Sequence, residues 1–133
     1  MGQITCTGKD GIIRTFDYKV ENSPSNKWIF RVTNIPPLKN DEFFELAVVE
    51  VDNLTVQVVM ANHFNIKEYA AKGIPEALLP AVKTILRREV ESSPSKSTTG
   101  DIYRTNAATN YWKRLCQSSG ANYDQTRDIY KVT

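Results

Sequence analysis

Few side chains of this chain can act as an acid, a base or a nucleophile at neutral pH. His63 is the only histidine, and it is a candidate general base, although an ordinary loop histidine is the alternative. Cys6 and Cys116 are the only cysteines and lie far apart in the sequence. As a nucleophile, Cys116 would need a basic neighbour in space, so we interpret it as a small buried side chain. One histidine and two distant cysteines lack the spacing of a zinc site, and we expect no bound metal.

A second candidate lies where a helical apolar pattern begins. Lys72 and Gly73 directly precede this pattern. The first N–H groups of a helix are free and its dipole is positive there, so this position is suited to an anion such as a phosphate. A plain helix cap is the alternative for the same two residues. The sequence leaves both interpretations open.

The segments that precede these candidate residues in the sequence are predicted to be strands, which would position them. Residues 12–20 alternate apolar and polar side chains, which is the pattern of a half-buried strand. Residues 28–33 predict a second strand. Residues 34–41 contain two prolines, which remove two ladder donors and predict a loop.

The strongest local pattern is a hairpin over residues 43–61. Two runs rich in β-branched residues flank Asp52 and Asn53, a pair that tolerates a two-residue turn. If Val51 faces Leu54, one face of the hairpin is apolar throughout; it carries Ala47, Val49, Val51, Leu54, Val56, Val58 and Met60. The other face is apolar away from the turn. Both faces are therefore predicted to be covered, with helices on each side of a central strand pair.

After Asn62 the apolar period becomes that of a helix. Residues 74–86 predict one amphipathic helix. A second helix is predicted to begin at Thr105 or Asn106 and to end at Gly120, and residues 128–132 predict a last short strand. The whole chain, residues 1–133, is predicted to be one domain, with N-terminal strands over 12–61 and helices and a last strand over 66–132. This order indicates an α+β or mixed α/β layer fold.

Two segments carry a resemblance to a known family. Residues 72–79, Lys-Gly-Ile-Pro-Glu-Ala-Leu-Leu, resemble the phosphate loop and helix start of the GNAT (N-acetyltransferase-like) superfamily. Residues 108–115 are similar to the late helix of that family, and the hairpin stands where its central strands would be. The resemblance covers residues 43–132, in a truncated and divergent form. It implies an acyl-CoA N-acyltransferase-like fold: a mixed, mainly antiparallel sheet with helices on both faces.

The resemblance also implies a function, the transfer of an acetyl group from acetyl-CoA to an amine acceptor. Pantetheine would lie along the hairpin's second strand, and the pyrophosphate would lie at the helix start. The implied cofactor-binding residues are Val58, Val59, Met60, Lys72, Gly73, Ile74 and Ala77. Tyr111 or His63 would carry the proton, whereas core aromatic packing is the alternative for Tyr111 and Trp112.

Two residues at the helix start favour a function other than acetyl transfer. Pro75 stands where the family has its second glycine or alanine, and it has no N–H to offer a phosphate. Glu76 adds a negative charge to the first helical turn. They favour a non-catalytic binding module of the same fold that contacts a protein partner. An unrelated α+β accessory protein of a mobile element is a further alternative, and a homodimer is left open.

Composition narrows the classes of partner. The chain has 17 basic and 15 acidic side chains, a net charge of +2, which does not indicate a nucleic-acid binder. No apolar run approaches the ~20 residues that a membrane span needs. Two separated cysteines and no apolar leader predict a cytoplasmic protein with reduced thiols.

Overall fold

The computed structural model describes residues 2–96 and 103–133. The N-terminal part consists of strands β1 (Gly2–Thr7), β2 (Ile13–Ser23), β3 (Lys27–Thr33), β4 (Phe44–Asp52) and β5 (Thr55–Asn62), with a short 3-10 turn, η1 (Lys39–Asp41), before β4. The C-terminal part consists of α1 (Ile74–Leu86), β6 (Glu89–Glu91), α2 (Asn106–Gln117), β7 (Ala121–Asp124) and β8 (Ile129–Val132). This is an α+β fold, as the sequence predicts.

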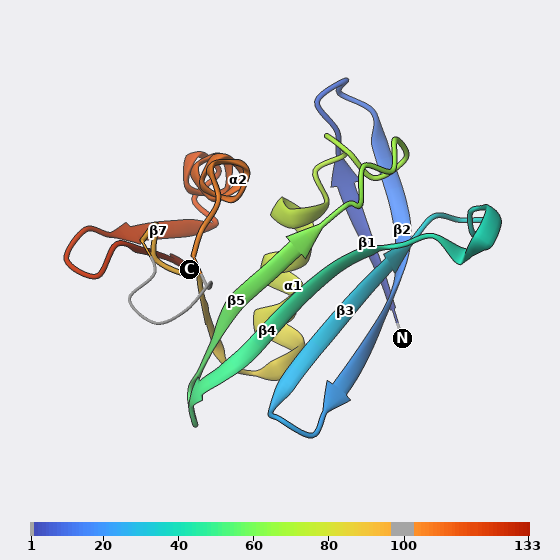
Figure 1. Cartoon of the computed structure of the whole chain (residues 1–133). Helices are drawn as coiled ribbons and strands as arrows, with labels where there is room; N and C mark the ends of the chain where they lie inside the picture. Colours follow the sequence, from blue (N-terminus) through green and yellow to red (C-terminus); the bar gives the residue numbers. More distant parts are fainter. Residues whose placement is uncertain (1, 97–102) are drawn as a thin grey trace.

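The described strands form one curled, eight-stranded mixed sheet in the order β1-β2-β3-β4-β5-β6-β8-β7 (Figure 1). The first five strands run as an antiparallel meander in sequence order. Among the described strands only β5 and β6 pair in parallel, and α1 is the crossover between them. The chain then places β8 between β6 and β7. Within the described residues, neither helix has the length and apolar character to cross a membrane.

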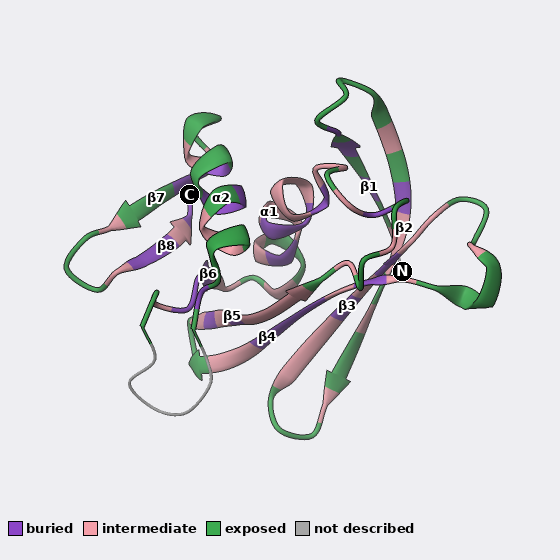
Figure 2. Cartoon of the chain, turned by 45° about the horizontal axis from the view of Figure 1, so that its top comes forward, coloured by how far each residue is buried: buried purple, intermediate pink, exposed green. Residues whose placement is uncertain are grey.

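The predicted helices on both faces of the sheet are not confirmed. Side chains of α1 and α2 belong to one core cluster with Phe30, Leu46 and Val56, which lie on a single face of the sheet. The buried side of α2 faces α1 in Figure 2. On the opposite face, Arg31 lies over the ring of Phe43 at 5.1 Å, and no described helix covers these strands (Figure 1). That face is partly polar, which explains why it does not require a helix.

The hairpin forms, but its turn lies one residue later than predicted. Asp52 pairs with Thr55, so Asn53 and Leu54 make the turn, and the Leu54 N–H donates to Asp52 Oδ1 at 2.8 Å. Aspartate side chains commonly accept the N–H of the residue two positions later, and this bond fixes the turn. The turn shift alone would keep the predicted faces, but the ladder is also irregular between Glu50 and Asp52. This irregularity pairs Val56 with Glu50 and Val58 with Val48, so both valines lie on the face of Val48, not on that of Val49. The predicted apolar face is therefore wrong.

The two helices begin as predicted. Gly73 precedes α1 with φ of 78°, a left-handed conformation that glycine adopts without strain. Thr105 caps α2, because its side-chain oxygen accepts the N–H of Ala108 at 3.1 Å. The sequence patterns did not predict β1, β6 or β7, which are edge strands or very short ones.

Candidate functional site

The main feature of the site is a cleft that opens where β5 separates from β6. The two strands pair only over residues 55–57 and 89–91. Further along β5, Met60 lies opposite Ala47 and Val58 lies opposite Val48, which leaves Val59 as an extra, unpaired residue. Such a β-bulge bends its strand, and here it lies where the strands diverge. The cleft has a volume of about 270 Å³.

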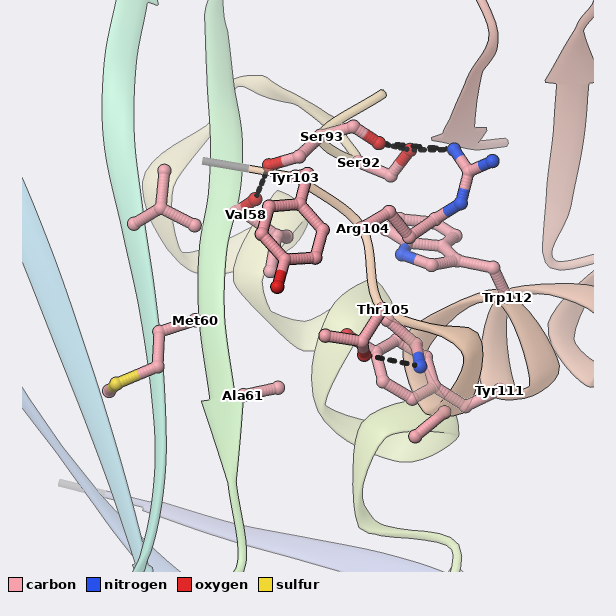
Figure 3. A pocket seen from close by; sticks show the side chains of 13 residues that line it. Val58, Met60, Ala61, Ser92, Ser93, Tyr103, Arg104, Thr105, Tyr111 and Trp112 are labelled. Atoms are coloured by element: carbon pink, nitrogen blue, oxygen red, sulfur yellow. Dashed lines mark hydrogen bonds between the residues drawn. The ribbon is translucent and has the colours of Figure 1, made fainter. Parts of the chain in front are cut away.

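The cleft has two walls of different origin (Figure 3). Residues 58–61 of β5 form one wall. The other wall is formed by Ser92 and Ser93 after β6, by residues 103–105, and by α2 from Ala107 to Trp112. The implied pantetheine residues Val58, Val59 and Met60 thus lie in the first wall. Tyr103, which is half-exposed, stands between the two.

A side-chain hydrogen bond joins the two walls at the closed end of the cleft. The hydroxyl of Ser93 donates to the carbonyl oxygen of Val58 at 2.6 Å, and both residues are buried. This bond replaces the next ladder bond that β6 would have made to β5. The cleft therefore begins immediately after Val58 and extends toward Ala61.

The second wall is held by Arg104, whose side chain is only 5% exposed. Its Nη1 atom donates to the carbonyl oxygens of Ser93 and Asp128, both at 3.0 Å. Its Nε atom donates to Thr109 Oγ1 on α2 at 2.8 Å, and Nη2 donates to Asp128 Oδ1 at 3.0 Å. The guanidinium also lies 4.9 Å from the ring centre of Tyr130. One buried cation thus ties the segment after β6, α2 and the β7–β8 turn together.

Asp128 is the partner that makes this arrangement stable. Its carboxylate accepts hydrogen bonds from the hydroxyl and the N–H of Ser95, from the Tyr123 hydroxyl at 2.7 Å, and from Arg104. These donors, the Ser95 hydroxyl first, hold the pKa of Asp128 well below its usual range. Sequence reasoning did not single out Asp128 and gave Arg104 no part in the site, because partners 24 residues apart leave no periodic signal.

Tyr111 and Trp112 are neighbours on α2 with different surroundings. Tyr111 is 7% exposed and projects from the helix toward β5 (Figure 3). Burial raises the pKa of its phenol, and the charge of Glu76 raises it further, so the group is protonated at neutral pH. Within the described residues its hydroxyl makes no hydrogen bond to another group. Trp112, in contrast, stacks on Tyr130 with ring centres 5.9 Å apart, as a core aromatic does.

His63 lies in the loop after β5 and is not part of either cleft wall. Its Nδ1 atom accepts the N–H of Asn65 at 3.0 Å, and its carbonyl oxygen accepts the N–H of Ile66. The imidazole therefore caps a loop turn. Of the two predicted proton carriers, only Tyr111 borders the cleft.

The start of α1 borders a second, smaller cavity of about 200 Å³. Gly73 is the only implied pyrophosphate residue that lines it. Ile74 is fully buried in the core, the Ala77 N–H donates to the Gly73 carbonyl oxygen at 3.2 Å, and Lys72 lines neither cavity. The main chain of Thr7 approaches Gly73 so closely that a Cβ at this glycine would collide with the Thr7 carbonyl oxygen.

Glu76 and Arg114 bridge the two helices beside this second cavity. Their side chains form an ion pair at 3.4 Å between the first turn of α1 and the last turns of α2. Cys6 lies nearby and is buried; burial, with a further contribution from Glu76, raises the pKa of its thiol to about 12. Cys6 is thus a neutral core side chain. Among residues 2–96 and 103–133, no group of three or more metal-ligating side chains gathers.

Comparison with protein-family models, with curated proteins and with solved structures finds no match to this chain.

Proposed function

We propose that this chain is a GNAT-like domain that binds acetyl-CoA in the cleft between β5 and α2 and transfers the acetyl group to an amine. The observation that carries this proposal is the divergence of the parallel pair β5 and β6 beyond Gln57, beside the bulge at Val59. Among the described residues, the divergence leaves one edge of β5 in the cleft without a strand partner. An extended pantetheine arm, with its two amides, can add to such an edge as another strand would.

Tyr111 supplies the proton in this proposal. The amine nitrogen bonds to the thioester carbon, the carbon–sulfur bond breaks, and the departing thiolate takes the phenolic proton. The amine loses its own proton to water. Burial keeps the phenol protonated at neutral pH, so a proton is present when the thiolate forms, although the raised pKa also makes the group a weaker acid than an exposed phenol.

A second candidate function is a binding module of the same fold without catalysis, which contacts a protein partner. One observation favours it: the described residues that line the cleft include no carboxylate and no imidazole that could take the proton of the amine. Acetyl-CoA would then be bound and not consumed. Binding and transfer must therefore be measured separately.

Binding is tested with a matched pair of variants on α2. Ala107 and Asn110 are both exposed, but only Ala107 lines the cleft. We expect acetyl-CoA to raise the melting temperature of the unaltered chain and of Asn110→Trp, and to leave that of Ala107→Trp unchanged. Absence of heat and of a melting shift with millimolar acetyl-CoA would refute the acyl-CoA proposal.

Transfer is tested with the same protein and small primary amines as acceptors. Tyr111→Phe is expected to keep its affinity for acetyl-CoA and to lose activity by a factor of about 100, because only the proton donor is removed. Full affinity with no transfer in the unaltered chain would select the non-catalytic module.

A further inference from the structure

The two cavities are neighbours along one face of α2. Tyr111 lines the cleft, and Arg114, one helical turn further along, lines the cavity at the start of α1. Glu76 also lines that second cavity, and its carboxylate pairs with Arg114 at 3.4 Å, which joins the cavity to the same helix. A ligand whose thioester end occupies the cleft would therefore direct its other end toward the start of α1.

The start of α1 presents oxygen atoms of the protein where such a ligand would bring its phosphates. The Thr7 carbonyl oxygen lies against Gly73, and the carboxylate of Glu76 stands in the first turn. Both oxygens already interact favourably with the positive end of the helix dipole. A pyrophosphate placed here would face a carboxylate and a carbonyl oxygen in addition to the helix.

The main-chain donors of this turn are also reduced in number. Pro75, in the first turn, has no N–H, so one of the donors that a helix start normally leaves free is missing. Arg114 is engaged by Glu76. Lys9 lines the cavity as well, but its side chain is exposed, and solvent and salt screen an exposed charge.

From these contacts, and on the basis of the proposed function, we infer that the cleft recognises its ligand through the S-acylpantetheine arm alone. The nucleotide end of coenzyme A contributes no affinity, and the Glu76–Arg114 pair is the element that prevents it from doing so. The substrate class is therefore an acylated pantetheine, regardless of the group attached to the end opposite the thioester.

The experiment compares two probes by calorimetry, acetyl-CoA and S-acetylpantetheine, which share the arm and differ in the nucleotide end. For the unaltered chain we expect dissociation constants within about threefold of each other, with little dependence on salt. Glu76→Gln should tighten acetyl-CoA by about fivefold to tenfold, because it removes the opposing charge and frees Arg114. S-acetylpantetheine should be unaffected.

The control is Glu21→Gln, which breaks a surface ion pair with Arg31 at 2.8 Å on β2, away from both cavities. It should change neither affinity. The inference is overturned if acetyl-CoA binds the unaltered chain about tenfold more tightly than S-acetylpantetheine, or if Glu76→Gln improves both probes equally. Either result leaves the proposed function standing. If neither probe binds at millimolar concentration, the proposed function fails, and the inference fails with it.

Discussion

The two walls of the cleft are built by different means. The β5 wall is a strand whose main chain is held by its ladder with β4, and its side chains make no ion pair among the described residues. The opposite wall includes residues 92–93 and 103–105, which belong to no helix or strand, and side chains hold them. There Arg104 and Asp128 join three segments through hydrogen bonds and one ion pair.

The difference predicts where the cleft is vulnerable. Ladder bonds are made by the backbone and survive most side-chain substitutions. A buried guanidinium has no such substitute, since removing one partner of a buried pair leaves the other without compensation. Substitutions in the second wall should therefore affect stability and cleft shape far more than those in the β5 wall.

The largest effect is expected for Arg104→Met. This change keeps much of the side-chain volume and removes every hydrogen bond that Arg104 donates to Ser92, Ser93, Thr109 and Asp128. We expect a loss of about 3–5 kcal/mol in the free energy of unfolding, measured by urea denaturation.

Arg14→Met is the matched control, because Arg14 forms a partly exposed pair with Asp10 at 2.7 Å. It should cost far less than Arg104→Met, because solvent screens this pair. Equal losses for the two variants would show that the buried pair has no special role in the second wall.

The same contrast explains what the sequence could predict. Residues 55–61 and 74–86 carry regular apolar patterns, and the strand and helix predicted there are present. The strands β5 and β6 diverge beyond Gln57, beside the bulge at Val59, and no pattern in the sequence marks this place. The predicted hairpin register was also wrong by one residue, because the ladder is irregular between Glu50 and Asp52, and no sequence pattern marks this place. Arg104 and Asp128 are 24 residues apart in the sequence and come together only in the folded structure.

Asp128→Asn should have the next largest effect, and the effect should depend on pH. Asn keeps the residue's size and tolerates its φ of 53° but removes the charge facing Arg104. Hydrogen bonds from Ser95 and Tyr123, with Arg104, lower the pKa of Asp128 in the folded state. The stabilisation is therefore complete above the unfolded pKa of about 3.9 and is lost as the pH falls through the lower folded value.

At neutral pH we expect Asp128→Asn to lower the free energy of unfolding by about 1–3 kcal/mol. This loss is smaller than for a fully buried pair, because the carboxylate is partly exposed to solvent. The difference from the unaltered chain should narrow below about pH 4. Urea denaturation at several pH values measures it. A difference that stays constant down to low pH would contradict the role of the charge.

A smaller effect is expected for Ser93→Ala, which removes the bond that pins the second wall to Val58. The carbonyl oxygen of Val58 loses its partner, and we expect a cost of about 1 kcal/mol. Ligand affinity should fall with it, because the closed end of the cleft is released. Ser118→Ala serves as the control: its hydroxyl donates to the Leu115 carbonyl oxygen at the end of α2, remote from the β5 wall, so ligand affinity should be unchanged.

The smallest effect is expected in the β5 wall itself, for Val59→Thr. Val59 is half-buried at the bulge, and threonine keeps both the volume and the β-branched shape that a strand favours. Because the ladder with β4 positions this wall, we expect a change of about 0.5 kcal/mol or less in the free energy of unfolding and an unchanged affinity for S-acetylpantetheine. A loss comparable to that of Asp128→Asn would mean that the bulge is held by the Val59 side chain. The β5 wall would then depend on side chains as much as the wall that Arg104 holds.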